Sequence, residues 1–264
     1  MMFFQSFNLD DHPFAETPDN CRLLADQRFE QALARLQFFN QCAHLAVVLG
    51  HTGTGKSSLL RLYLSALPKN HFNPVYLHLT LVNPNALLRL IVNALGEKPK
   101  MGKDRLFLQL IDKIRNTDAH TLLIIDEAHL LADQALTDLR LMISSGIDAQ
   151  LPIKIILCGQ MPLAAQLKRS HHADLLNRVG VQVRLASLSK HQTCAYIDHR
   201  ITCVGGSAAL FDNDAKQLIH DFAGGICRQI NNIATACLIQ ANASNARQIN
   251  TDIVHQAIAE LHMT

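Results

Sequence analysis

The sequence lacks the features of several specialised protein classes. No apolar run reaches the roughly 18 residues that a membrane-spanning helix needs. The apolar start Met1–Phe4 has neither a basic beginning nor a small-residue cleavage site, so it is not typical of a signal peptide. These absences predict a cytoplasmic protein with no membrane partner.

The sequence also lacks the cysteine and histidine spacings that are typical of metal-binding sites and disulfide frameworks. The seven cysteines are odd in number, with none spaced as CxxC, and the fourteen histidines contain no HExxH. We therefore expect buried free thiols, and we expect the pair His171–His172 to lie on a loop surface rather than bind a metal. A net charge of +2 neither favours nor excludes nucleic acid, so any DNA contact would need clustered basic residues.

The hydrophobic pattern indicates a globular α/β protein. Hydrophobic residues make up 48% and charged residues 17% of the 264 residues, enough for one large core and one smaller one. Predicted strands alternate with predicted helices, an arrangement typical of a mostly parallel sheet with helices on both sides. The strands are expected at residues 45–49, 75–80, 122–125, 153–158 and 181–185. The helices between them are expected at 26–39, 56–67, 84–96, 104–115 and 136–143.

The pattern changes after Leu188. Ser189 and Gln192 form a capping box, and three or four helices follow with no strand between them. Residues 1–20 contain Pro13 and Pro18 and are expected to be irregular. We predict a lead-in and helix at 1–40, a P-loop α/β domain at 41–187, and a small helical lid domain at 188–264.

The strongest motif is GHTGTGKSS, which follows a predicted strand and opens a helix. It matches GxxxxGK[ST], in which glycines let backbone N–H groups face phosphates at a helix N-terminus. Lys56 is expected to reach the β- and γ-phosphates of ATP, and Ser57 to bind Mg²⁺. The residues expected to bind the nucleotide are Gly50, His51, Thr52, Gly53, Thr54, Gly55, Lys56, Ser57 and Ser58.

The second motif is LLIIDEAH, from Leu122 to His129. A carboxylate just past a buried strand is placed to meet magnesium beside the phosphate loop, and Asp126 has that position. Glu127 is next and is placed to polarise the attacking water.

Three further residues have open interpretations. Gln160 follows the strand at 153–158. It either hydrogen-bonds the γ-phosphate or the attacking water, or it is a turn residue after Gly159. Arg178 lies before the last strand, from where its side chain would enter a neighbouring subunit's site. Arg228 is at the start of a helix of the second domain, and its side chain would reach back to the γ-phosphate. For both arginines an ordinary solvated surface position is the alternative.

These motifs, with both ends of the chain, resemble the ExeA-like AAA+ ATPases. The matching segments are FFQSFNLDDHPFAETPD, the phosphate loop, LLIIDEAHLL, IILCGQMPL, LLNRVGVQVRL and GGICRQINNIATACL, in that order over nearly the whole chain. The group includes ATPases of type II secretion and pilus assembly, and transposon-encoded target-selection ATPases akin to the Mu B and TnsC proteins.

The resemblance implies roles by position. Gln160 falls in the sensor 1 region, Arg178 in the arginine-finger region and Arg228 at the sensor 2 arginine, while adenine would lie near Pro13 and Phe14. The sequence departs from the family at Cys227, where proline is usual. Gln160 also replaces the asparagine, serine or threonine common in the wider superfamily.

The resemblance also implies a choice between two branches. Secretion-type members are expected to continue past the lid into a membrane segment, whereas this chain ends at Thr264. The segments INNIATACLIQA and VYLHLTLVNPNALLRLIVNALGEKPKMGKDRLF look closer to the transposon members. We therefore expect a homo-oligomer, ring or filament, that assembles with ATP on duplex DNA and recruits a transposase. The alternatives are a secretion or pilus ATPase, and a scaffold that binds ATP but scarcely hydrolyses it.

A cationic loop is the candidate for DNA contact. Lys98, Lys100 and Lys103 lie between a helix stop at Gly96 and the next helix. A flexible loop with several cations would track phosphates without reading bases, and a solvated surface loop is the other interpretation.

Overall fold

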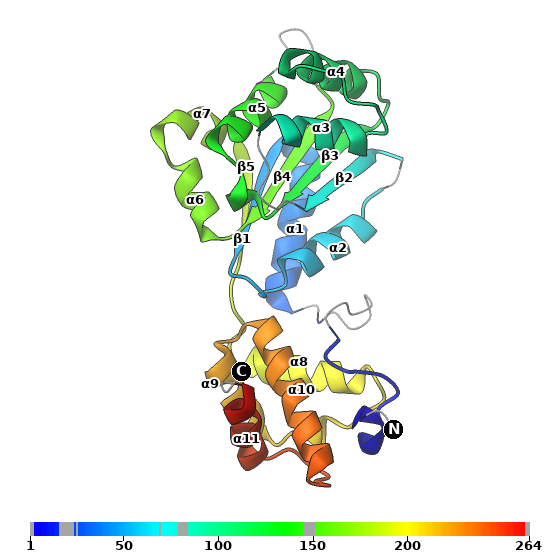
Figure 1. Cartoon of the computed structure of the whole chain (residues 1–264), viewed down its shortest axis with the longest axis vertical. Helices are drawn as coiled ribbons and strands as arrows, with labels where there is room; N and C mark the ends of the chain where they lie inside the picture. Colours follow the sequence, from blue (N-terminus) through cyan, green and yellow to red (C-terminus); the bar gives the residue numbers. More distant parts are fainter. Residues whose placement is uncertain are drawn as a thin grey trace. The chain divides into compact units, whose positions relative to one another are not determined.

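The computed structural model describes residues 3–15, 24, 26–68, 70–78, 84–144 and 151–261. It divides into two compact units. The α/β unit comprises Phe29–Gly50 and Lys56–Leu185, and the helical unit comprises Met1–Arg28, His51–Gly55 and Ala186–Thr264. Figure 1 labels the elements of both units. In the described part of the chain no helix is both apolar enough and long enough to cross a membrane.

A five-stranded sheet forms the centre of the α/β unit. Its order is β2-β3-β4-β1-β5, and every pair is parallel, which confirms the predicted sheet type. The three central strands, β3, β4 and β1, consist of continuous apolar sequence, as expected for strands that are buried on both faces. The strands are β1 Leu45–Gly50, β2 Phe72–His78, β3 His120–Asp126, β4 Ile153–Gly159 and β5 Val179–Leu185.

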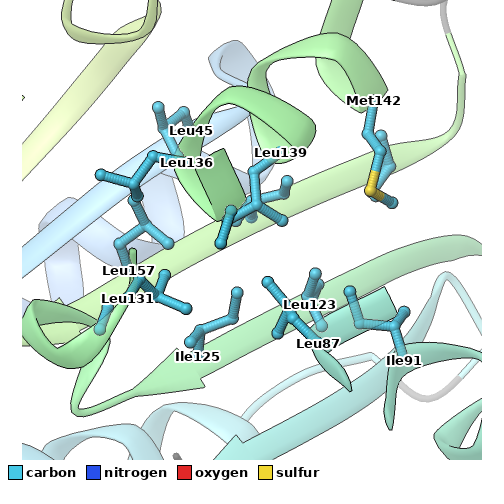
Figure 2. Packing of buried hydrophobic residues seen from close by; sticks show 14 of the residues in the cluster. Leu45, Leu87, Ile91, Leu123, Ile125, Leu131, Leu136, Leu139, Met142 and Leu157 are labelled. Atoms are coloured by element: carbon cyan, nitrogen blue, oxygen red, sulfur yellow. The ribbon is translucent and has the colours of Figure 1, made fainter. Parts of the chain in front are cut away.

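Helices cover both faces of this sheet (Figure 1). On one face, residues of α3, α4 and α5 pack against alternate residues of β1, β3 and β4, as Leu136, Leu139 and Met142 do in Figure 2. On the other face α1 and α2 pack against the intervening residues. The helices are α1 Gln27–Cys42, α2 Lys56–Ser65, α3 Pro84–Ala94, α4 Lys103–Arg115, α5 Asp133–Ser144, α6 Met161–Leu167 and α7 Ala173–Leu176, with 3-10 turns η3 Ala128–Leu130 and η4 Ser170–His172.

Two parts of the α/β unit differ from expectation. Strand β2 begins at Phe72, before Pro74, whereas the prediction began at Val75; the predicted end at Thr80 lies outside the described residues. An edge strand tolerates proline because one side of its backbone needs no partner, and β2 is at the sheet edge. Helices α6 and α7 were not predicted, since 7 and 4 residues are too few to show helical periodicity.

The helical unit contains the four helices that follow β5 in sequence. They are α8 Lys190–Thr202, α9 Asn213–Ala223, α10 Cys227–Ala243 and α11 Thr251–Leu261, with a 3-10 turn η5 Ala208–Leu210. The capping box of Ser189 and Gln192 is confirmed at the start of α8. The N-terminal segment, expected to be irregular, contains the 3-10 helix η1 Phe3–Phe7, and Phe4, Leu9 and Phe14 are buried in the core of this unit.

Arg200 fastens the N-terminal segment to α8. Its side chain is 2% exposed, and its guanidinium donates to the carbonyl oxygens of Pro13 (2.6 Å) and Ala15 (3.0 Å) and to the Tyr196 hydroxyl (3.0 Å). The guanidinium carbon lies 5.9 Å from the Phe14 ring centre. Carbonyl oxygens and an aromatic face together stabilise this buried cation.

We predict that Arg200→Met lowers the free energy of unfolding by about 3 kcal/mol, because the buried carbonyl group of Pro13 and the partly buried one of Ala15 lose their charged donor. Chemical denaturation measures this loss, and amide exchange of residues 4–15 should accelerate. Arg247→Met is the matched control, since Arg247 is exposed in the same unit. Unfolding curves that coincide for Arg200→Met and the wild type would contradict the fastening role.

Candidate functional site

The parallel register brings the two phosphate-site motifs to one edge of the sheet. Strand β1 ends at Gly50 and β3 ends at Asp126, with β4 between them. Leu49 is level with Gly159, and Ile125 with Leu157, so all three strands finish at the same edge. Open parallel sheets bind ligands at this carboxyl edge.

Lys56 opens α2 directly after the glycine-rich loop. The residue is 5% exposed, and its ammonium donates to the carbonyl oxygen of Gly50 at 3.1 Å. The side chain therefore folds back over the loop, at the N-terminus of a ten-residue helix whose dipole attracts anions.

Ser57 and Asp126, 69 residues apart in sequence, meet beside Lys56. The Ser57 hydroxyl donates to Asp126 Oδ2 at 3.1 Å, and the Tyr76 hydroxyl donates to the same oxygen at 2.6 Å. The backbone N–H of Glu127 donates to Oδ1 at 2.9 Å. Asp126 is 1% exposed, so these donors replace the water that the carboxylate would otherwise bind.

The donors keep Asp126 ionised despite its burial. Burial acts to raise the pKa of Asp126, but hydrogen bonds from Tyr76, Cys158, the Glu127 backbone and Ser57 outweigh it and lower the pKa below its ordinary value. Burial, followed by the hydrogen bond to Asp126, raises the pKa of Tyr76, which therefore remains a protonated donor.

Glu127 has an unusual backbone conformation for a glutamate. Its φ of 56° lies in the left-handed region, where it turns the chain from β3 into η3. Its Oε2 lies 3.2 Å from His129 Nδ1, and both atoms are shielded from solvent. The two adjacent carboxylates therefore have different neighbours, with Asp126 bonded to Ser57 and Tyr76 and Glu127 beside His129.

Within the helical unit, residues of the glycine-rich loop contact the start of α10. The backbone N–H of Arg228 donates to the Gly53 carbonyl at 3.1 Å. Gly53 has φ of +80°, and a Cβ added there would lie 2.8 Å from Arg228 Cβ and 3.0 Å from Ile226 Cγ2. Glycine is needed here both for the backbone angle and for the close approach.

The remaining predicted site residues lie in different surroundings. Gln160 is the N-cap residue of α6, just past β4, and is partly buried. Arg178 and Arg228 are exposed. Phe14 is 3% exposed, with its ring edge-to-face against Phe211. Phe14 also lines an open hollow of about 390 Å³, together with His12, Ala15, Asn232, Thr235, Ala236, Ile239 and Leu261.

The residues present fit a magnesium–nucleotide complex. Gly53 and Gly55 have φ of +80° and +99°, which turn the loop in a way that favours inward backbone N–H groups. Lys56 supplies a cation, and Ser57 with Asp126 supplies the oxygen ligands that magnesium prefers.

The cationic loop is held more firmly than expected. The side chain of Gln109 is 8% exposed; it donates to Glu97 Oε2 and to the Lys98 carbonyl, and accepts from the Lys100 backbone N–H. Lys98 and Lys100 are exposed, whereas the Lys103 ammonium lies 2.9 Å from the buried carboxylate of Asp138. Hence the expected flexible loop is a fixed turn, and Lys103 has an intramolecular partner.

The pair His171–His172 is not simply a loop surface. His172 is 1% exposed, and its Nε2 lies 3.1 Å from Asp133 Oδ1; His171 Nε2 lies 3.2 Å from Oδ2. Gln166 and Arg169 also donate to this carboxylate. The hydrogen bond from Gln166, then that from His172, lowers the pKa of Asp133 well below its usual range. An arginine in the cluster disfavours a metal ion, so we interpret it as an anchor between α5 and η4.

Cysteine placement agrees only in part with the expectation of buried thiols. None of the six cysteines in the described part of the chain forms a disulfide, but Cys42 and Cys203 are exposed. Cys227, which stands where the family usually has proline, is the first residue of α10, so the helix begins there without a proline.

Sequence reasoning missed Tyr76 and His129 as neighbours of the two acidic residues. Nothing in the sequence around Tyr76 signals a polar role, because its partner comes from the adjacent strand through the register of β2 with β3. His129 belongs to the quoted DEAH segment, and its contact with Glu127 follows from the η3 turn.

Comparison with known proteins agrees with this geometry. The protein-family model described as "AAA domain" matches residues 41–167, from the end of α1 through α6. Cdc6p from Pyrobaculum aerophilum superimposes with a TM-score of 0.76 at 21% identity, covering 96% of this chain and 71% of that one. The fold is that of the AAA+ P-loop ATPases.

Two further proteins are similar to this chain. General secretion pathway protein A of Aeromonas hydrophila is 29% identical over 258 residues, which cover 94% of this chain and 46% of that protein. The chain thus spans about half the length of this curated relative. The Drosophila ORC, in a structure bound to DNA, matches with a TM-score of 0.74 at 19% identity, covering 98% of this chain and 65% of that one.

Proposed function

We propose that the protein is a magnesium-dependent ATPase that assembles into a homo-oligomer. The observation that carries the proposal is the convergence of Ser57 and Asp126, 3.1 Å apart, beside the buried Lys56. The hydroxyl and the carboxylate come from motifs 69 residues apart, and their convergence is the arrangement that a bound magnesium–phosphate group requires.

Each residue of the site has a distinct role in this proposal. Residues Gly50–Ser58 cradle the phosphates, with Lys56 facing the β- and γ-phosphates, and Ser57 with Asp126 holds magnesium. Glu127 accepts the proton of the attacking water. Gln160 and Arg228 contact the γ-phosphate from their own elements, and Pro13 with Phe14 lies near the adenine. Bound magnesium would neutralise charge on the phosphates.

We predict that Glu127→Gln lowers ATP turnover by roughly 10²–10⁴-fold while ATP affinity is kept, because an amide keeps the size but cannot accept a proton. Phosphate release and a nucleotide titration measure the two quantities. Glu30→Gln, on the exposed face of α1, is the matched control. Lys56→Ala should instead abolish binding. Near-normal turnover in Glu127→Gln would remove this residue from the mechanism.

Arg178 is proposed to act on the nucleotide of a neighbouring subunit. The residue is exposed after α7, and α7 is tied to α5 by Arg140 and Asp174, which lie 3.0 Å apart. The anchor around Asp133 holds the preceding segment. A cation on a firmly held surface segment suits a contact across an interface.

We predict that Arg178→Ala leaves ATP binding intact but lowers turnover by on the order of 10³-fold. Mixing it with Lys56→Ala should recover part of the activity, because some interfaces then join an intact loop to an intact Arg178. Arg247→Ala, another exposed arginine, serves as control. Failure of every mixing ratio, with both variants still assembling, would argue against a role across the interface.

For the partner we propose duplex DNA, with a transposase recruited to the assembly. The resemblance to transposon-encoded ATPases that we expect from two sequence segments motivates this proposal, and so does the pair of exposed cations Lys98 and Lys100 on a fixed turn. A structure of the Drosophila ORC, which has a similar fold at 19% identity, contains DNA. The protein would then act as a transposition regulator that selects target DNA while ATP is bound.

A second candidate is an ATPase of type II secretion or pilus assembly. The similarity to General secretion pathway protein A, over 94% of this chain, favours it. Its partner would be a secretion or pilus machine rather than DNA. A DNA-binding measurement separates the two candidates.

We predict that ATP drives the protein onto duplex DNA with little sequence preference, and that affinity falls steeply with salt, with a slope of roughly −0.9 per phosphate contacted. Lys98→Glu combined with Lys100→Glu should weaken binding to all sequences alike while basal ATPase activity survives. Lys168→Glu with Arg247→Glu changes the net charge equally at other exposed positions and is the matched control. A mobility assay with ATP at low salt that detects no duplex binding would favour the secretion candidate.

A further inference from the structure

Tyr76 combines an exposed ring with a buried hydrogen bond. The residue is 42% exposed on the edge strand β2, yet its hydroxyl donates to Asp126, the carboxylate that is 1% exposed at the end of β3. The 2.6 Å separation is shorter than the usual O–H···O hydrogen bond and typical of a hydroxyl that donates to an ionised carboxylate. Packing of the ring contributes little at such an exposed position, so the hydroxyl is the distinctive feature.

The hydroxyl acts on the same oxygen that Ser57 contacts. Asp126 Oδ2 accepts from Tyr76 on β2 and from Ser57 on α2, while Oδ1 accepts from the Glu127 backbone. Both carboxylate oxygens are thereby fixed in direction. Without Tyr76, the hydroxyl donor that remains on Oδ2 is Ser57, the residue that is itself proposed to bind magnesium.

We propose that Tyr76 is a positioning residue for the magnesium site, which orients the Asp126 carboxylate toward the ion held with Ser57. The inference rests on the proposed function and adds a residue to it that acts through Asp126. Hydrogen-bond partners of metal ligands typically contribute about 10–100-fold to metal affinity. Tyr76 therefore affects magnesium and not the nucleotide itself.

The test is Tyr76→Phe in the 264-residue chain, with equilibrium binding of ATP measured in EDTA and over a magnesium titration. We expect unchanged affinity in EDTA and about a 10-fold rise in the magnesium concentration that gives half of the magnesium-dependent gain in affinity. Tyr63→Phe is the matched control, because the Tyr63 hydroxyl binds Asn40 instead of Asp126. Tyr63→Phe should give the same magnesium titration of ATP affinity as the wild type.

Two outcomes would overturn the inference. One is a magnesium titration of Tyr76→Phe that coincides with the wild type; the other is an equal loss of affinity with and without magnesium, which indicates a general disturbance of the site. The same magnesium titration with Asp126→Asn distinguishes failure of the Tyr76 inference from failure of the magnesium assignment. If Asp126→Asn abolishes magnesium dependence and Tyr76→Phe does not, only the Tyr76 inference fails. If neither variant alters it, the magnesium assignment in the proposed function fails as well.

Discussion

The α/β unit depends on keeping one carboxylate charged where water is excluded. An isolated carboxylate in the interior would become protonated, and a neutral acid is a poor ligand for a divalent cation. Four structural elements send donors to Asp126, with Ser57 from α2, Tyr76 from β2, Cys158 from β4 and the Glu127 backbone after β3. The position of the neighbouring strands is therefore part of the chemistry, because each places one donor.

Those parts of the structure that rest on local pattern could be predicted. Apolar runs located the central strands, and the glycine-rich loop with its lysine located the junction of β1 and α2. Contacts that depend on strand register could not be predicted. Tyr76 reaches Asp126 only because β2 pairs with β3 in the observed register. The start of β2 was misplaced for a related reason, since whether Pro74 is tolerated depends on the strand being at the edge.

Buried polar side chains account for other features that the sequence pattern did not indicate. Arg200 holds the N-terminal segment through backbone carbonyl groups, and Gln109 shapes the cationic turn in the same way. Almost every residue has the same backbone N–H and C=O groups. The sequence of the segment that supplies them therefore does not indicate which side chain will bind there. Asp133 differs, because its partners are side chains, yet these are over 30 residues away.

The close approach at Gly53 has a consequence for the evolution of the chain. A side chain at this position would meet Arg228 and Ile226, and the left-handed backbone adds a further penalty for any other residue. Change in the loop and change in the first turn of α10 are thus tied to each other, although about 170 residues separate them in sequence. Homologues that alter one should alter the other, so substitutions at these two places should covary across lineages.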